Sequence, residues 1–333
     1  MRQWKWLQEE APDDAKLLFS IVDLHAITMP QDALVLMQHK REMLAALMAI
    51  GLDPDKSILF YQSSVPEHTE LMWILSCTAS MGYLGRMTQW KSKLQMNNKA
   101  REFDESVAAQ LKLGLFSYPV LQAADILVHR ATHVPVGDDQ RQHLEFSREC
   151  ATNFNSAYGP HLVSPETITT PSSRVMSLVN PLNKMSKSAL NHRSRILITA
   201  SPDEIRQRVM GAVTDSLNVV TYEPTRRPGV ANLLEILSQC TTTISPEDGS
   251  VVRATPAELA EELSGLTLGD LKREVVKAVT QELAGIRDRF DDVLNRAGGK
   301  YLDGIQAEGA EKARQNAAET MRIVRDAVGL AAT

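Results

Sequence analysis

Cysteine is scarce in this sequence of 333 residues, and the three cysteines, Cys77, Cys150 and Cys240, are far apart. This spacing indicates neither a CxxC zinc site nor a disulfide framework, and it fits a reducing compartment. Long apolar runs are missing too, so no segment is long enough to cross a bilayer. Residues 1–16 have neither the apolar core of a signal peptide nor the Arg/Ser-rich, acid-poor character of an organellar presequence.

Glycine-rich nucleotide-binding fingerprints are also missing, because neither GxGxxG nor GxxxxGK occurs anywhere in the sequence. Their absence argues against a dinucleotide-dependent enzyme. The net charge of −5 argues against a generally basic nucleic-acid-binding protein. Residues 174–208 nevertheless contain seven basic and two acidic side chains, a local excess of five positive charges that could meet a polyanion. Ordinary scatter of charge on a solvated surface is the alternative.

The order of expected elements indicates an α/β fold. Short apolar runs at residues 17–22, 57–61 and 133–136 predict buried strands. Between and after them, helical patterns fall at residues 32–50, 67–80, 119–128 and 138–154, and a polar stretch at 91–105 reads as an exposed insertion or loop. Strands that alternate with helices imply a parallel sheet with ligands at the carboxyl ends of its strands.

The last third of the sequence is predicted to be helical. Apolar residues recur at spacings of three and four over residues 268–293 and 310–328. Together with the length of the chain, this predicts two domains, an α/β domain at residues 1–200 and an all-α domain at 201–333. The loop at 181–192 is the expected linker.

The sequence KMSKS at residues 184–188 follows Asn180-Pro181 and is expected on a loop. Two lysines that flank a serine suit a polyphosphate, because the ammonium groups can follow charge onto the leaving oxygens. The alternative is a mobile surface loop without function. A shorter KxSK pattern would favour that alternative, whereas the full five residues after an α/β region favour a phosphate-binding loop.

Two further segments can carry chemistry. At residues 134–143 a strand stops at Gly137 and a helix begins with Asp138 and Asp139, which either cap the helix or accept ribose hydroxyls. At residues 118–127 Asp125 lies among small and aliphatic residues. Helical Asp is usually exposed, and a buried one needs a donor such as an indole N–H.

In this order, the three segments resemble class I tryptophanyl-tRNA synthetases, and the resemblance covers nearly the whole chain. Shorter matching stretches are DLHAIT at 23–28, QSSVP at 62–66, MSL at 176–178, AVTD at 212–215 and PGVANLL at 228–234.

The resemblance implies a Rossmann-like catalytic domain followed by a helical domain that reads the tRNA anticodon. It implies that Asp125 binds the indole nitrogen, in a tryptophan site that also contains Tyr118, Gln140 and His25. The implied ATP site consists of Gly137, Asp138, Asp139, Val175, Lys184, Met185, Ser186, Lys187 and Ser188. Of these, Lys184, Ser186 and Lys187 are the expected catalytic residues, and no protein metal site is expected.

The implied reaction has two steps. The tryptophan carboxylate attacks the α-phosphorus of ATP and releases pyrophosphate, with Mg²⁺ on the phosphates, and the 3′-terminal ribose of tRNA(Trp) then attacks the adenylate. The resemblance also implies a homodimer. It is strongest to organellar members of the family, which implies a mitochondrial location, with the cytoplasm as the alternative.

One departure from the family concerns the start of the sequence. In the family, a first strand and a glycine-rich turn with a HIGH-type signature precede the residues that Met1-Arg2-Gln3-Trp4 match. We favour a shortened reading frame as the explanation, and we expect the chain as written to activate tryptophan poorly. An inert remnant that binds tRNA or a partner, and a tyrosine-type synthetase, are the rival functions.

Overall fold

The computed structural model describes residues 2–12, 14–88, 90–91, 94, 111–137, 140–169, 175–186, 189, 191–241, 243–244, 251–252 and 254–331. Most of the predicted insertion at 91–105 and the start of the predicted helix at 138 lie outside these residues. The chain forms two compact units. Unit 1 comprises Met1–Pro171 with Val293–Thr333, and unit 2 comprises Ser172–Asp292.

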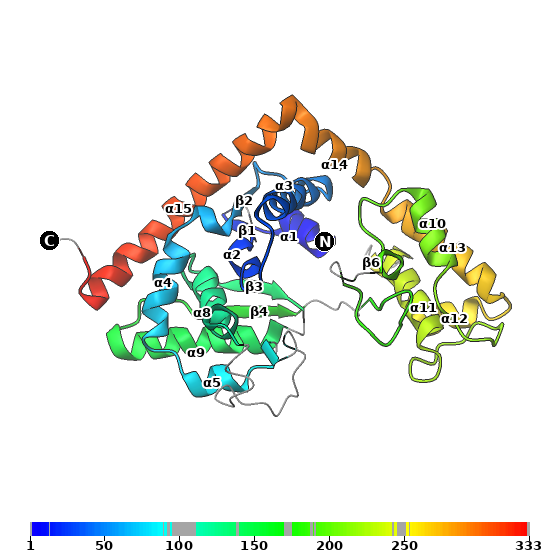
Figure 1. The fold of residues 1–333 in the computed structure, drawn as a ribbon, viewed down its shortest axis with the longest axis horizontal. Coiled ribbons are helices and arrows are strands. Elements are labelled where there is room, and N and C mark those ends of the chain that lie inside the picture. Colours follow the sequence, from blue (N-terminus) through cyan, green and yellow to red (C-terminus); the bar gives the residue numbers. More distant parts are fainter. Residues whose placement is uncertain are drawn as a thin grey trace. The chain divides into compact units, whose positions relative to one another are not determined.

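Unit 1 contains two pairs of parallel strands (Figure 1). Strand β1 (Leu17–Ile21) pairs with β2 (Ser57–Tyr61), so that Leu17 lies opposite Ser57, and helix α3 (Ala33–Ala49) connects them. Strand β3 (His133–Val136) pairs with β4 (Glu166–Thr169) across helix α9 (Arg141–Tyr158). Parallel neighbours need such a crossover connection, and the predicted α/β class is confirmed.

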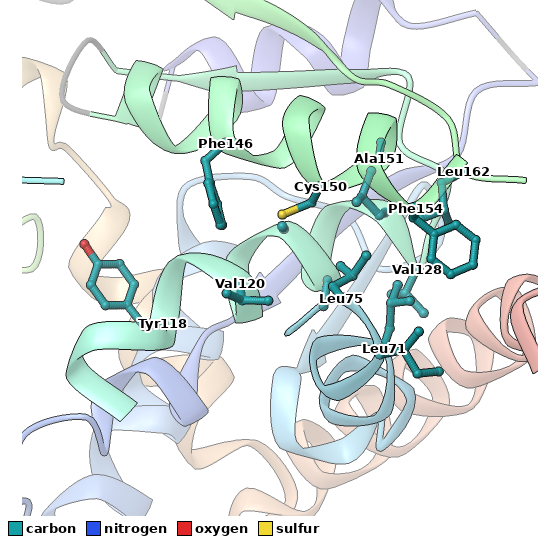
Figure 2. Close-up of a cluster of buried hydrophobic side chains, with 14 of the residues drawn as sticks. Leu71, Leu75, Tyr118, Val120, Val128, Phe146, Cys150, Ala151, Phe154 and Leu162 are labelled. Carbon is teal, nitrogen blue, oxygen red and sulfur yellow. The ribbon is translucent and has the colours of Figure 1, made fainter. Parts of the chain in front are cut away.

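The core of unit 1 is formed by helices α4 (Glu67–Ser76), α8 (Leu113–Leu127) and α9. Figure 2 shows Leu71 and Leu75 of α4, Val120 of α8, and Phe146 and Phe154 of α9 directed into one cluster, in which all five side chains are buried. Burial of each such side chain stabilises the fold by about 1.5–3 kcal/mol. This packing holds α8, which carries the candidate site.

Helix α8 begins earlier than its sequence predicts. The sequence predicts a start at Pro119, whereas the helix begins at Leu113 and contains Pro119. Leu115 and Phe116 are buried in the core, and their burial favours a helical turn before the proline. Shorter helices of unit 1 are α1 (Arg2–Glu10), α2 (Asp23–Ala26), α5 (Met81–Arg86), and the 3₁₀ turns η1 (Gln62–Ser64) and η4 (Arg296–Gly299).

Helix α15 (Lys300–Val328) packs on strand β2 and helix α4 of unit 1, so unit 1 includes residues from both ends of the chain. A β-carbon at Gly309 would lie 1.9 Å from the carbonyl oxygen of Leu59 in β2, so only glycine permits this close approach. The units therefore divide the chain differently from the predicted ranges 1–200 and 201–333. Helical periodicity shows which residues are apolar, but it does not show which element they contact.

Unit 2 is mainly helical. Its helices are α10 (Pro202–Met210), α11 (Pro228–Cys240), α12 (Pro256–Glu262), α13 (Leu268–Glu282) and the first part of α14 (Ile286–Asn295), with the short strands β5 (Thr243–Ile244) and β6 (Val251–Val252) and the turn η3 (His192–Ser194). Helices α10, α12 and α13 each begin with a capping box, in which Ser or Thr and an acidic residue bond each other's backbone N–H. The predicted apolar stripe along α13 is buried, including Leu271 and Val275. No helix in the described part of the chain has both the length and the apolar character of a membrane span.

Candidate active site

The Asp125 carboxylate lies at the centre of a polar cluster in unit 1. His25 Nε2, from α2, lies 2.8 Å from Asp125 Oδ2. His68 Nδ1, from α4, lies 2.6 Å from Asp125 Oδ1, and Gln62 Nε2 donates to the same oxygen at 2.7 Å. The backbone N–H of Leu24 donates to Gln62 Oε1 at 3.1 Å, which turns the amide NH₂ of Gln62 toward the carboxylate. Three side chains from separate elements therefore orient one acceptor.

The electrostatics of this cluster keep Asp125 ionised. Burial by itself raises the pKa of Asp125, but hydrogen bonds from His25 and His68 outweigh burial and lower the pKa to about 2. A carboxylate offers about four lone-pair directions, of which the three contacts above use three. The side chain is 13% exposed. Asp125 can therefore accept one further hydrogen bond, on Oδ2, from a ligand that reaches the cluster.

The other three predicted tryptophan-site residues lie around Asp125. The ring of His25 meets the ring of Tyr118 edge to face at 6.1 Å between centroids. Gln122, one helical turn before Asp125 on α8, donates from Nε2 to Gln140 Oε1 at 3.1 Å. The contacts thus connect His25 with Asp125 and Tyr118, and they connect Gln140 with helix α8 through Gln122.

Tyr118 is itself held in place at the edge of the core. Its hydroxyl lies 2.8 Å from His143 Nε2, and the two rings are stacked at 5.4 Å. Burial raises the pKa of Tyr118, so the phenol is neutral at physiological pH. Figure 2 shows the Tyr118 hydroxyl directed away from the other labelled core side chains.

Sequence reasoning missed the roles of Gln62 and His68 in this cluster. Gln62 directly follows β2, and ligands of parallel sheets bind at the carboxyl ends of the strands. Gln62 also lies within the QSSVP match, so its position in the sequence could have predicted a role in the site. His68 gave no signal, because a single histidine in an amphipathic helix is more often a packed core residue. It is completely buried.

The residues predicted to contact ATP lie in both units. In unit 1, Gly137 follows β3 and accepts a hydrogen bond from the backbone N–H of Gln140 at 2.9 Å. Asp138 and Asp139, between them, lie outside the described residues, as do Lys187 and Ser188 of the KMSKS sequence.

In unit 2, the first residues of KMSKS lie against the segment that contains Val175. Met176 and Lys184 form an antiparallel bridge, and the Met185 N–H donates to the Val175 carbonyl at 3.0 Å. Buried Asn232 of α11 accepts from the Met176 N–H and donates to the Met176 carbonyl, both at 2.9 Å. Lys184 and Ser186 are exposed. The described part of the loop is therefore anchored at its base by Asn232, and sequence reasoning missed this role of Asn232.

The described residues contain no group of three or more His, Cys, Asp or Glu side chains that could hold a metal ion. The two candidate groups are the shielded Asp125 carboxylate of unit 1 and the exposed Lys184 and Ser186 side chains of unit 2. The first suits a neutral donor such as N–H, and the second suits an anion.

Comparison with known proteins agrees with this chemistry. Residues 1–284 match the family described as tRNA synthetases class I (W and Y). The chain is 40% identical to the mitochondrial tryptophan--tRNA ligase of Schizosaccharomyces pombe, over 99% of this chain and 90% of the relative. It is also 40% identical to the tryptophan--tRNA ligase of Caldanaerobacter subterraneus, over 99% of this chain and 92% of the relative.

Among solved structures, the tryptophanyl-tRNA synthetase of Campylobacter jejuni in complex with ADP and tryptophan has a TM-score of 0.73 and 30% identity, and the match covers 99% of this chain and 93% of that one. The match to the family spans both the segment with Asp125 and the segment with KMSKS. The chain belongs to the class I tRNA synthetases, in the branch of the tryptophanyl-tRNA synthetases.

Proposed function

We propose that this chain is a tryptophan--tRNA ligase that activates L-tryptophan with ATP and transfers it to tRNA(Trp). The observation that carries this proposal is the oriented, ionised carboxylate of Asp125 in a chain that is 40% identical to tryptophan--tRNA ligases. Both relatives are tryptophan--tRNA ligases, and the proposed function gives Asp125 and the KMSKS loop the following roles.

Asp125 recognises the indole ring. An indole N–H is a donor with no acceptor of its own, so it fits the open lone pair on Asp125 Oδ2. A ligand without a donor would leave a partly buried carboxylate unpaired, which is costly. Tyr118 and His25 provide aromatic surface beside this acceptor, and Gln140, which accepts a hydrogen bond from Gln122 of the same helix, is assigned to the site as well.

The KMSKS loop acts on the phosphates. In the first step the tryptophan carboxylate oxygen forms a bond to the α-phosphorus, and the bond to the bridging oxygen of pyrophosphate breaks. Lys184, Ser186 and Lys187 stabilise the negative charge that moves onto pyrophosphate. Gly137, Asp138 and Asp139 contact the ribose side of ATP, with Val175, Met185 and Ser188 completing the nucleotide site. Mg²⁺ enters with ATP, since it binds mainly through substrate phosphates.

The proposed function also implies partners and a location for the protein. The transfer step needs no nucleophilic side chain, because the tRNA ribose hydroxyl attacks the adenylate directly. We assign anticodon contacts to the helical part of the chain and a homodimeric state to the protein, which sedimentation velocity tests. A mitochondrial location is supported by the S. pombe relative, and imaging of the native protein tests it.

Amino-acid-dependent exchange of labelled pyrophosphate into ATP tests the proposed function. Tryptophan should support exchange, and tyrosine and phenylalanine should not. Calorimetric titration with each amino acid provides a second measurement that does not require ATP. Exchange with tyrosine alone would show that the chain is a tyrosine-type synthetase. Binding of no amino acid would reject the ligase assignment.

A further inference from the structure

The Asp125 carboxylate is the first member of a chain of polar side chains that ends on helix α15. His68 Nδ1 contacts Asp125 Oδ1 at 2.6 Å, and His68 Nε2 contacts His129 Nε2 at 3.0 Å. His129 Nδ1 contacts Asn316 Oδ1 at 2.7 Å. All four residues belong to unit 1, and His68 and His129 are buried. The contacts connect a candidate substrate-binding group to a helix near the end of the chain.

The donors and acceptors in this chain determine where its protons lie. Asn316 Oδ1 can only accept, so His129 must carry its proton on Nδ1, and its Nε2 is then an acceptor. His68 must therefore donate from Nε2 to His129. Asp125 can only accept as well, so His68 also donates from Nδ1. His68 consequently carries a proton on both ring nitrogens and pairs as an imidazolium with the Asp125 carboxylate.

The surroundings of the two histidines support this arrangement. The buried ring of Phe60 packs edge to face with both rings, at 5.9 Å from His68 and 5.6 Å from His129 between centroids, and so limits access of water. Burial, followed by the charge of His68, lowers the pKa of His129 to about 4, which keeps His129 neutral. A neutral His129 can accept from His68 and donate to Asn316 at the same time.

We propose that Asn316 is a positioning residue for tryptophan, which acts through His129 and His68 to hold Asp125 as an oriented acceptor for the indole N–H. This inference rests on the proposed function. With His68 and Gln62 both donating to Oδ1, the carboxylate plane is fixed, and Oδ2, which His25 also contacts, keeps one lone pair for the ligand. Without the acceptor on Asn316, His129 can move its proton to Nε2, which removes the acceptor for His68. His68 then accepts at Nε2 and donates to Asp125 from Nδ1 as a neutral ring, so the carboxylate loses its charged partner and is held by a weaker hydrogen bond.

The test compares two ligands that differ at the indole nitrogen. L-Tryptophan and β-(3-benzothienyl)-L-alanine, in which sulfur replaces the N–H, are titrated calorimetrically into the wild type, Asn316→Leu and Gln315→Leu. Gln315 is the exposed neighbour on the same helix and serves as the matched control. The preference of the wild type for tryptophan over the sulfur analogue should fall about tenfold in Asn316→Leu and should not change in Gln315→Leu.

A general structural role for Asn316 would weaken both ligands equally, and that result, or an unchanged preference, would overturn the inference. Binding of neither ligand by the wild type would instead reject the proposed function. Since Asn316→Leu could fail to fold, ¹⁵N NMR of the His68 ring in the wild type gives a second test. Two protonated ring nitrogens are expected, and a bare Nε2 would contradict the proposed proton arrangement whatever the behaviour of the variant.

Discussion

The two groups that carry the proposed reaction are built in opposite ways. In unit 1, Asp125 is shielded and accepts hydrogen bonds from His25, His68 and Gln62. In unit 2, the KMSKS loop is anchored at its base through Met176 and Asn232, and its first lysine and serine are exposed. A group that recognises a bound substrate gains from fixed orientation and exclusion of water, whereas a group that follows moving charge is needed only in the transition state. The comparison therefore predicts that unit 1 determines tryptophan affinity and that the loop determines rate.

The largest expected effect is on the rate, from Lys187→Ala. Removing the second lysine should lower the rate of tryptophan activation by about 10²–10³-fold, because it removes charge stabilisation made only in the transition state. Tryptophan affinity should stay nearly constant. Pyrophosphate exchange at saturating tryptophan measures the rate, and calorimetry measures the affinity. Arg226→Ala, which removes an exposed positive charge in the same unit, is the control. An unchanged rate in Lys187→Ala would show that the loop has no role in catalysis.

The next effect is on affinity, from Asp125→Asn. The amide keeps the shape of the carboxylate but loses its charge and one acceptor oxygen, so kcat/KM for tryptophan should fall by about 10–100-fold. The loss should be much smaller for the benzothienyl analogue, which has no N–H to bind. Steady-state exchange kinetics measure kcat/KM for both amino acids, and Asp55→Asn, at an exposed position, is the control. Equal losses for the two amino acids would mean that Asp125 has only a structural role.

A third prediction tests whether α15 is part of the framework of the unit 1 site. Gly309→Ala should destabilise the protein by about 2–4 kcal/mol, because the added methyl group collides with the backbone of Leu59. Gly304→Ala on the same helix meets no atom within 4 Å and should stabilise it by about 0.5–1 kcal/mol. Urea unfolding of both variants gives the comparison. A stable Gly309→Ala variant would show that α15 is not packed against β2.

The last expected effect is the pH dependence of stability contributed by His129. Its pKa in the folded chain, about 4, lies below the usual value of 6.5, so only the unfolded state binds a proton between these values. As pH falls from 6.5 to 4, the free energy of unfolding should decrease by roughly 1–3 kcal/mol. The groups that face His129 are His68, Asp125 and neutral Asn316, and the pKa of Asp125, about 2, places its titration below this range.

Urea unfolding as a function of pH measures this contribution. His129→Gln should lose less stability on acidification than the wild type, and His39→Asn, at an exposed position, should behave like the wild type. Parallel curves for the wild type and His129→Gln would contradict a neutral buried His129.

The sequence allowed prediction of elements with a local signal. Alternating apolar strands and helices predicted the parallel α/β class, and the lone carboxylate of an apolar helix drew attention to Asp125. Contacts between distant residues had no such signal. His129 is 61 residues from His68 and 187 residues from Asn316, so only the fold reveals that they touch. For the same physical reason the C-terminal helix was assigned to a separate domain, although it packs on β2.

The division of roles between Asp125 and the loop is tested most directly by one double-mutant cycle. The kcat/KM for tryptophan-dependent pyrophosphate exchange is measured for the wild type, Asp125→Asn, Lys187→Ala and the double variant. If Asp125 acts on binding and Lys187 on the transition state, the two free-energy losses are independent and should add to within about 0.5 kcal/mol. A double variant no slower than the slower single variant would show that both residues act on the same step, and would contradict this account.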